Sequence, residues 1–291
     1  MKTAALAVLS AAVLMSVFGC GGDDAPDTGT DTDTDTTTTA AQTFSISFTL
    51  PAETDNKNQI SDGAGIDYEF DLDDATLYRT RLSQTMDLGA DYTDRFLFVC
   101  DHITYGLRSL GMLDAGRTTD QVVTGAGASF FVTSPSMMMY LPEEDRSLPL
   151  TELVSERKPE YILLAVGAAD VGSDSKPSTV DFRDDYIALI ESVKEASPDS
   201  IIICMSVLPG SRSSGFSIYD AESYNKMILS AAAATEVYYL DAASAFAASS
   251  GYLREDCDGG SSRLSTTGLL RLLEVVRTHH PVADTDDDKT E

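Results

Sequence analysis

Short apolar runs in the second half of the chain have the pattern of buried strands. Four of them are apolar almost throughout and a fifth is weaker: 96–100 (FLFVC), 161–166 (YILLAV), 201–208 (IIICMSVL), 237–240 (VYYL) and 121–124 (QVVT). Runs of this length that have no polar face are typical of parallel strands that are covered on both sides.

Segments with helical spacing lie between these runs. One has its apolar stripe over 186–193 and ends before Ser197, a second covers 223–234, and a third runs from the N-cap candidate Ser265 to Thr278. This alternation predicts a three-layer α/β/α sandwich around a mostly five-stranded parallel sheet. In such a fold, ligands bind outside the carboxyl ends of the strands.

The segment 43–85 has a different pattern. Residues 44–50 and 66–72 alternate strictly between apolar and polar side chains, and a polar loop joins them. A period of two with one wet face indicates strands at a surface. We therefore expect an accessory N-terminal β-hairpin within 43–85, followed by the main domain over 86–281.

The first twenty residues have the features of an export signal. Lys2 precedes an apolar run over 4–18, and the sequence that ends in Cys20 resembles the lipobox of bacterial lipoproteins. We expect an extracytoplasmic protein that is anchored to the membrane through a lipidated Cys20; the alternative is a plain secretory signal with a chance cysteine. The Asp/Thr-rich tether 21–42 and the acidic tail 282–291 have too few apolar groups to fold.

Composition excludes some partners. The net charge is −27, so the chain repels phosphate backbones and we expect no nucleic-acid partner. The four cysteines have no metal-site spacing, so we expect no metal and no cofactor. Cys100 and Cys204 lie in apolar runs and are expected to be buried. Cys100 and Cys257 belong to loops that should meet, which predicts a disulfide between them, with two unrelated thiols as the alternative.

Two further segments are open to more than one interpretation. The run Met137-Met138-Met139-Tyr140 is typical of core filling, although it could line a pocket. The serine-rich loop 211–217 follows a predicted strand and is interpreted as a solvated loop.

Three blocks of residues follow predicted strands or precede the last helix: 100–107 (CDHITYGL), 167–170 (GAAD) and 258–265 (DGGSSRLS). They resemble motifs of the SGNH/GDSL hydrolases, which read G-D-S-x-T-Y-G-L, G-x-N and D-G-x-H-L-(N/S)-x-x-G. The resemblance is to exported members from gut Firmicutes, and it extends from about Asp87 to about His279. It implies a flavodoxin-like fold and the hydrolysis of esters by a serine nucleophile.

The first blocks keep the framework of the family motifs and lose the nucleophile. Asp101 matches the family's Asp, but His102 occupies the position of the catalytic serine. A further segment, Thr124-Gly125-Ala126-Gly127, is counted as the second block, so that 167–170 and 258–265 are the third and fourth; its Gly125 is a candidate oxyanion donor through its N–H group. Gly167 matches the glycine of the third block.

The remaining catalytic positions are substituted as well. Ala169 stands where the family has the oxyanion-binding Asn, Arg263 stands where it has the base His, and Gly260 replaces the Asp that orients this base. A slip of one residue would instead align Asp258 with that Asp and Ser261 with the His, which still supplies no imidazole. Arg cannot act as a base at neutral pH.

The chain has only two other histidines, His279 and His280. A helical rise of ~1.5 Å per residue places them roughly 20 Å from the site. We therefore expect a pseudoenzyme that binds a glycan or an acylated ligand, in a pocket that has drifted. The alternatives are a new acid–base reaction on Asp101, His102 and Arg263, an active serine-type or atypical carbohydrate esterase or lipase, and a structural or adhesive surface protein.

Overall fold

The computed structural model describes residues 72–282 together with two short strands, β1 (Ile60–Ser61) and β2 (Asp67–Tyr68). Within 72–282 it leaves out 110, 112, 114–120, 126–130, 133–136, 174–176, 214–215 and 262. The predictions for the signal peptide, Cys20, the tether, the strand 44–50 and the tail after Val282 lie outside the described residues.

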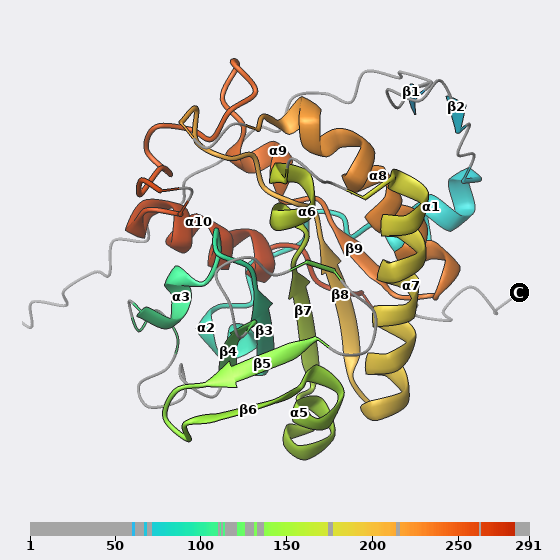
Figure 1. Ribbon diagram of the computed structural model, residues 1–291, viewed down its shortest axis with the longest axis vertical. Coiled ribbons are helices and arrows are strands. Elements are labelled where there is room, and N and C mark those ends of the chain that lie inside the picture. Colours follow the sequence, from blue (N-terminus) through green and yellow to red (C-terminus); the bar gives the residue numbers. More distant parts are fainter. Residues whose placement is uncertain are drawn as a thin grey trace, which may run out of the picture. The chain divides into compact units, whose positions relative to one another are not determined.

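A seven-stranded sheet forms the centre of the described domain (Figure 1), in the spatial order β6-β5-β4-β3-β7-β8-β9. Five neighbouring strands are parallel: β4 (Val122–Gly125), β3 (Phe96–Cys100), β7 (Tyr161–Ala165), β8 (Ile201–Met205) and β9 (Tyr238–Leu240). This is the strand order of flavodoxin-like sheets, in which the order of successive strands reverses between the first and third parallel strands. The predicted five-stranded parallel core is confirmed, and a crevice is expected where β3 and β7 end.

The sheet has two more strands than the sequence predicted. β5 (Met138–Leu141) and β6 (Arg146–Pro149) form an antiparallel hairpin that extends the edge beside β4. Met139 is buried whereas Met138 and Tyr140 are exposed, so the methionine run is a short strand with one wet face. A strand of four residues is too short for its alternation to be distinguished from a core segment.

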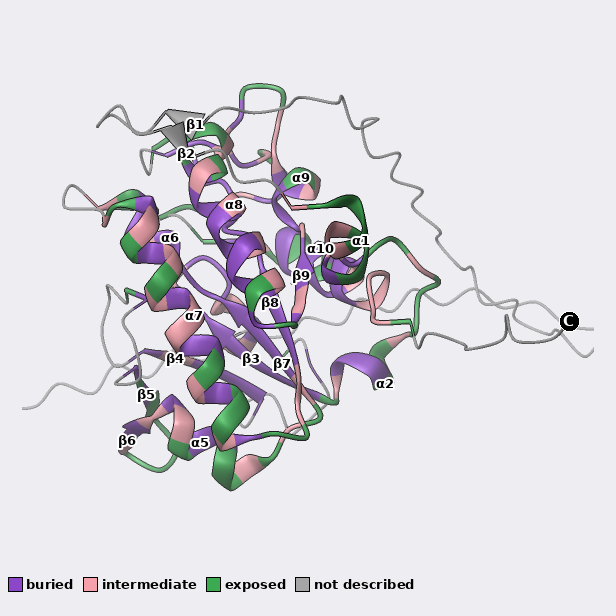
Figure 2. Cartoon of the chain, turned by 90° about the vertical axis from the view of Figure 1, so that its right-hand side faces the viewer, coloured by how far each residue is buried: buried purple, intermediate pink, exposed green. Residues whose placement is uncertain are grey.

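Helices cover both faces of the sheet (Figure 2), which confirms the three-layer sandwich. One layer contains α5 (Leu150–Arg157), α7 (Thr179–Ala196) and α8 (Ile218–Ala234), and the other contains α2 (Ala90–Thr93) and α10 (Thr266–Arg277). Shorter helices lie in the connections: α3 (Gly106–Ser109), α6 (Ala168–Gly172) and α9 (Ala243–Phe246). None of the described helices is long and apolar enough to span a bilayer.

Local signals predicted two helix ends and missed a third. The Ser265 side chain accepts a hydrogen bond from Gly268 N and starts α10 as predicted, and α7 ends before Ser197. α8 begins at Ile218, five residues before the predicted start, because Ser217 and Asp220 form a capping box there.

The segment 43–85 differs from the predicted hairpin. Its described strands pair Ile60–Ser61 with Asp67–Tyr68, and residues 74–80 form a helix, α1 (Asp74–Thr80), instead of β structure. Asp73 caps this helix through Thr76 N. After α1, Leu82 N donates to Tyr239 O, so this segment covers the free edge of β9 and belongs to the main domain.

Candidate active site

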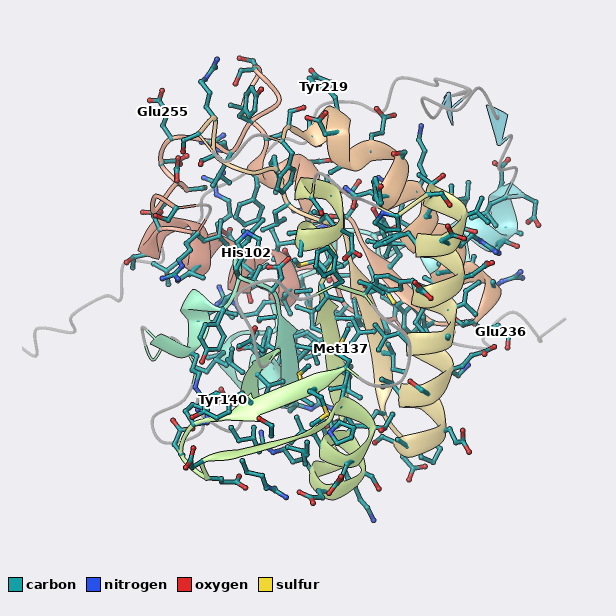
Figure 3. All side chains as sticks on the ribbon, viewed as in Figure 1. His102, Met137, Tyr140, Tyr219, Glu236 and Glu255 are labelled. Carbon is teal, nitrogen blue, oxygen red and sulfur yellow. The ribbon has the colours of Figure 1, made fainter. Side chains whose placement is uncertain are left out.

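The turn after β3 contains the first family block. The Asp101 carboxylate turns back on its own loop, where one oxygen accepts hydrogen bonds from Ile103 N (2.9 Å), Thr104 N (3.3 Å) and Thr104 Oγ1 (3.2 Å). Asp101 N donates to Ala165 O at the end of β7 (2.9 Å). His102 is half-buried at the upper end of β3 (Figure 3). The block therefore forms a hydrogen-bonded turn that carries the His102 imidazole at the carboxyl end of β3.

The third block begins at a glycine that no other residue can replace without strain. Gly167 has a φ of +124°, and a Cβ there would lie 2.9 Å from Val207 Cγ2 and 3.3 Å from Phe182 Cζ. Ala169 is half-buried in the first turn of α6, and its methyl group has no hydrogen-bond donor. The structure thus places a positive-φ glycine at the end of β7 and a side chain without a donor two residues later.

The fourth block meets the first one. Leu264 N donates to Ile103 O (3.1 Å), which brings the loop before α10 beside the turn that carries His102. Within this loop, the Asp258 carboxylate accepts from Gly260 N (2.8 Å) and Gly260 has a φ of +80°. Arg263 is exposed.

Gly125 ends β4, where it is buried and paired with Met139. The second block therefore lies at the carboxyl end of β4. The first and third blocks lie at the carboxyl ends of the neighbouring strands β3 and β7.

Two buried carboxyl groups give this edge its electrostatic character. Burial raises the pKa of Asp101, an effect that His102 and the turn N–H groups oppose. The pKa of Asp170 is raised to about 6, chiefly by burial. Hydrogen bonds from the N–H groups of Val132 and of Asp170 itself lower this pKa, and the negative charges of Asp185 and Asp101 raise it. Val132 N donates to Asp170 Oδ2 at 3.0 Å. Sequence reasoning gave Asp170 no role, although its place at the end of the third block was a usable signal.

A second residue that sequence reasoning missed is Asn225 of α8. Its amide accepts from Val207 N (2.7 Å) and donates to Val207 O (3.2 Å). Asn225 thereby fixes the loop after β8, which is the loop that packs on Gly167 through Val207. A lone asparagine in a helix carries no sequence signal for this role.

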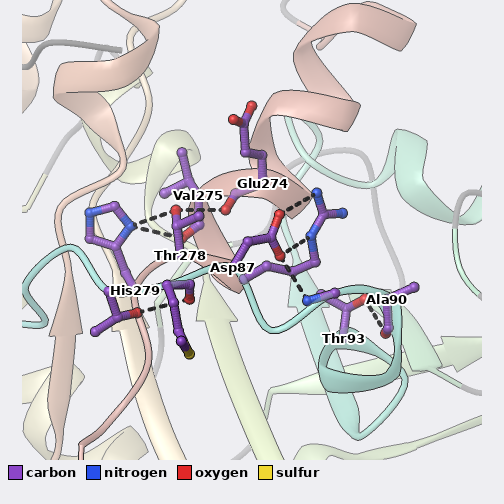
Figure 4. Close-up of polar contacts among 11 residues, drawn as sticks. Asp87, Ala90, Thr93, Glu274, Val275, Thr278 and His279 are labelled. Carbon is purple, nitrogen blue, oxygen red and sulfur yellow. Dashed lines mark hydrogen bonds and ion pairs between the residues drawn. The ribbon is translucent and has the colours of Figure 1, made fainter. Parts of the chain in front are cut away.

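The other two histidines lie at the opposite end of the sheet. His279 Nδ1 hydrogen-bonds to Val275 O (2.9 Å) just beyond α10, near the Asp87–Arg277 ion pair (Figure 4). The His280 ring lies 5.8 Å from that of Tyr92 in α2, the helix that precedes β3. Both histidines are therefore at the amino end of the strands, as their sequence distance predicted.

Two hollows lie at the opposite end of the sheet from the family blocks. One of about 740 Å³ is lined by residues at the starts of β3, β4 and β7, and another of about 710 Å³ lies where β9 begins. At the carboxyl edge, by contrast, residues 206–211 after β8 are buried.

The predicted disulfide is wrong. Cys100, Cys204 and Cys257 are all free and buried. Burial at the end of β3 raises the pKa of the Cys100 thiol to about 12, so it behaves as a small apolar side chain. Cys257 O instead accepts from Ser265 N (2.8 Å), so its backbone supports the cap of α10.

The arrangement could move protons, because an imidazole and two carboxyl groups lie in adjacent turns. Attack on an ester by the family mechanism would require a serine paired with a histidine base. Among the residues that the structure describes, no group of three His, Cys, Asp or Glu side chains could hold a metal ion.

Comparisons with known proteins agree with this architecture. Residues 110–281 match the model of the GDSL-like Lipase/Acylhydrolase family. No curated protein matches the chain.

Among solved structures, the chain is similar to a GDSL-like lipase from Bacteroides thetaiotaomicron (13% identity, 67% of this chain and 90% of that one, TM-score 0.44). It is also similar to an acetyl xylan esterase from Geobacillus stearothermophilus (16%, 70% and 99%, TM-score 0.40) and to the OSK domain of Drosophila Oskar (16%, 69% and 94%, TM-score 0.40). On its family match, the chain belongs to the GDSL-like lipase/acylhydrolases.

Proposed function

We propose that this protein is a surface lipoprotein whose GDSL-like domain binds a glycan or an acylated ligand without hydrolysing it. One observation carries this proposal: the chain has three histidines, and the only one at the carboxyl edge, His102, occupies the position of the nucleophile. His279 and His280 contact residues at the other end of the sheet.

Ester hydrolysis in this family makes three chemical demands. A serine hydroxyl becomes a nucleophile only when a base takes its proton. That base is an imidazole, and the oxyanion needs preorganised donors. In this chain the positions of the nucleophile, the base and the oxyanion donor hold His102, Arg263 and Ala169, so none of the three requirements is met.

The surroundings of Asp101 support the same proposal. Its carboxylate is taken up by the N–H groups and the hydroxyl of its own turn, so it stabilises the loop. What the edge retains is rigid backbone at Asp101 and Gly167, which suits binding.

A stepwise restoration of the family residues tests this proposal. His102→Ser alone and Arg263→His alone should each leave p-nitrophenyl acetate hydrolysis at background, because a nucleophile without a base, or the reverse, does nothing. His102→Ser with Arg263→His, helped by Ala169→Asn and Gly260→Asp, should hydrolyse the ester measurably above the wild type. A wild type that already matches the restored variant would contradict the proposal.

One alternative keeps catalysis at this edge. An acid–base reaction on His102, Asp101 and Arg263 would use the buried carboxyl and the half-buried imidazole. It predicts that the wild type is active and that both His102→Ala and His102→Ser abolish this activity. The same two variants therefore separate it from a non-catalytic domain.

A further inference from the structure

An exposed aromatic group lies at the carboxyl edge of the sheet, outside the family blocks. Tyr219, the second residue of α8, is 67% exposed and lies at the outer end of that helix (Figure 3). Tyr252, in the loop after β9, is half-buried, and Arg212 Cζ lies 5.1 Å from the centre of its ring. We propose that Tyr219, Tyr252 and Arg212 form a binding site for a neutral saccharide.

The turn at Gly251 contacts Tyr219 and leads directly into Tyr252. Gly251 has a φ of +80°, and a Cβ there would lie 2.5 Å from Tyr219 Cε2, so the Tyr219 ring packs directly on the Gly251 backbone. Ile218 N donates to Gly251 O (2.7 Å), and Gly251 N donates to Ala248 O (2.8 Å). Tyr252 follows Gly251 in the chain, so one turn fixes both aromatic positions before any ligand arrives.

This turn is attached to the edge that carries the family blocks. Leu253 N donates to Gly210 O in the loop after β8 (2.9 Å), and Asn225 of α8 holds the same loop through Val207. The described parts of the loops after β8 and β9 are thus joined at the carboxyl ends of these strands. Ligands of doubly wound sheets bind at this edge.

The chemistry of the group fits a sugar ring. The apolar C–H face of a pyranose can lie on the electron-rich face of an exposed tyrosine. The Arg212 guanidinium carries five N–H donors for sugar hydroxyls. Arg212 is exposed, and its guanidinium carbon lies over the Tyr252 ring.

The charge of the chain narrows the ligand class. At −27 overall, the protein repels polyanionic glycans, so an uncharged saccharide is the better match. This inference rests on the proposed binding role and specifies its ligand as a glycan rather than an acyl group.

Fluorine NMR of the full-length protein labelled with 3-fluorotyrosine tests the site. The chain has twelve tyrosines, and Tyr219→Phe and Tyr252→Phe identify the two signals that matter. We expect xylohexaose to shift both signals, and a hexamer of galacturonic acid to bind more weakly. Tyr219→Ala should weaken xylohexaose binding about tenfold or more, because it removes the stacking surface.

The matched control is Tyr78→Ala, since Tyr78 is 80% exposed on α1, away from the proposed site. It should leave xylohexaose affinity unchanged. Absence of binding, equal binding by Tyr219→Ala, or tighter binding of the acidic hexamer would overturn the proposed site. Hydrolysis of p-nitrophenyl acetate by the same preparation would overturn the proposed loss of catalysis instead, so the two failures are distinguishable.

Discussion

Replacing Asp170 by asparagine should stabilise the fold at neutral pH. The carboxyl group is buried, and its pKa rises from an ordinary value of 3.8 to about 6. Each pH unit of such a difference corresponds to about 1.4 kcal/mol, so ionising this group costs the folded state roughly 3 kcal/mol. An asparagine oxygen can still accept the hydrogen bond that Val132 N gives to Asp170 Oδ2.

The pH dependence gives the prediction its sign. The pKa of Asp170 is higher in the folded state than in the unfolded state. Ionisation of Asp170 therefore costs the wild type nothing below about pH 4, and the cost reaches its full size as the pH rises through about 6. Urea unfolding of the wild type and of Asp170→Asn should therefore coincide near pH 4 and separate by up to about 3 kcal/mol near pH 7.

The control is Asp199→Asn, an exposed carboxyl in the turn before β8. It should follow the wild type at every pH. A variant that is less stable than the wild type at neutral pH, or a difference that does not change with pH, would refute the reasoning.

Three further outcomes follow. Gly167→Ala should cost about 2–4 kcal/mol in urea unfolding, because its Cβ would meet two side chains at a positive φ; Gly260→Ala, with open space around it, should cost only about 1 kcal/mol. Cys100 and Cys257 should react with a thiol reagent only after unfolding, and reactivity that first requires a reductant would contradict their free state. Cys20→Ala should release the protein from membranes, and a wild type found wholly soluble and unlipidated would refute the anchor.

The sequence predicted the parallel core because its strands are apolar throughout. FLFVC at 96–100 has the length and pattern of a strand covered on both faces, and β3 has those bounds. The hairpin β5–β6 escaped prediction because each strand has four residues. Helix α1 was missed because its capping signal at Asp73 lies within a segment whose alternation dominated the interpretation.

The sequence predicted which loops form the site, but it did not predict which side chains interact there. The order of the motifs placed Asp101, Gly167 and Arg263 at one edge. The buried state of Asp170 and the role of Asn225 depend on segments distant in the sequence, Val132 and Val207. Local pattern does not report such contacts. The predicted pairing of Cys100 with Cys257 failed for the same reason: loops that share an edge need not bring two particular thiols together.

The most direct test of a non-catalytic domain is ester turnover by the wild-type protein. Purified full-length protein should hydrolyse p-nitrophenyl acetate and acetylated xylan no faster than its His102→Ala variant, with both at the rate of the buffer. A wild-type rate far above background that collapses in His102→Ala would show that the carboxyl edge is catalytic, and would contradict the account.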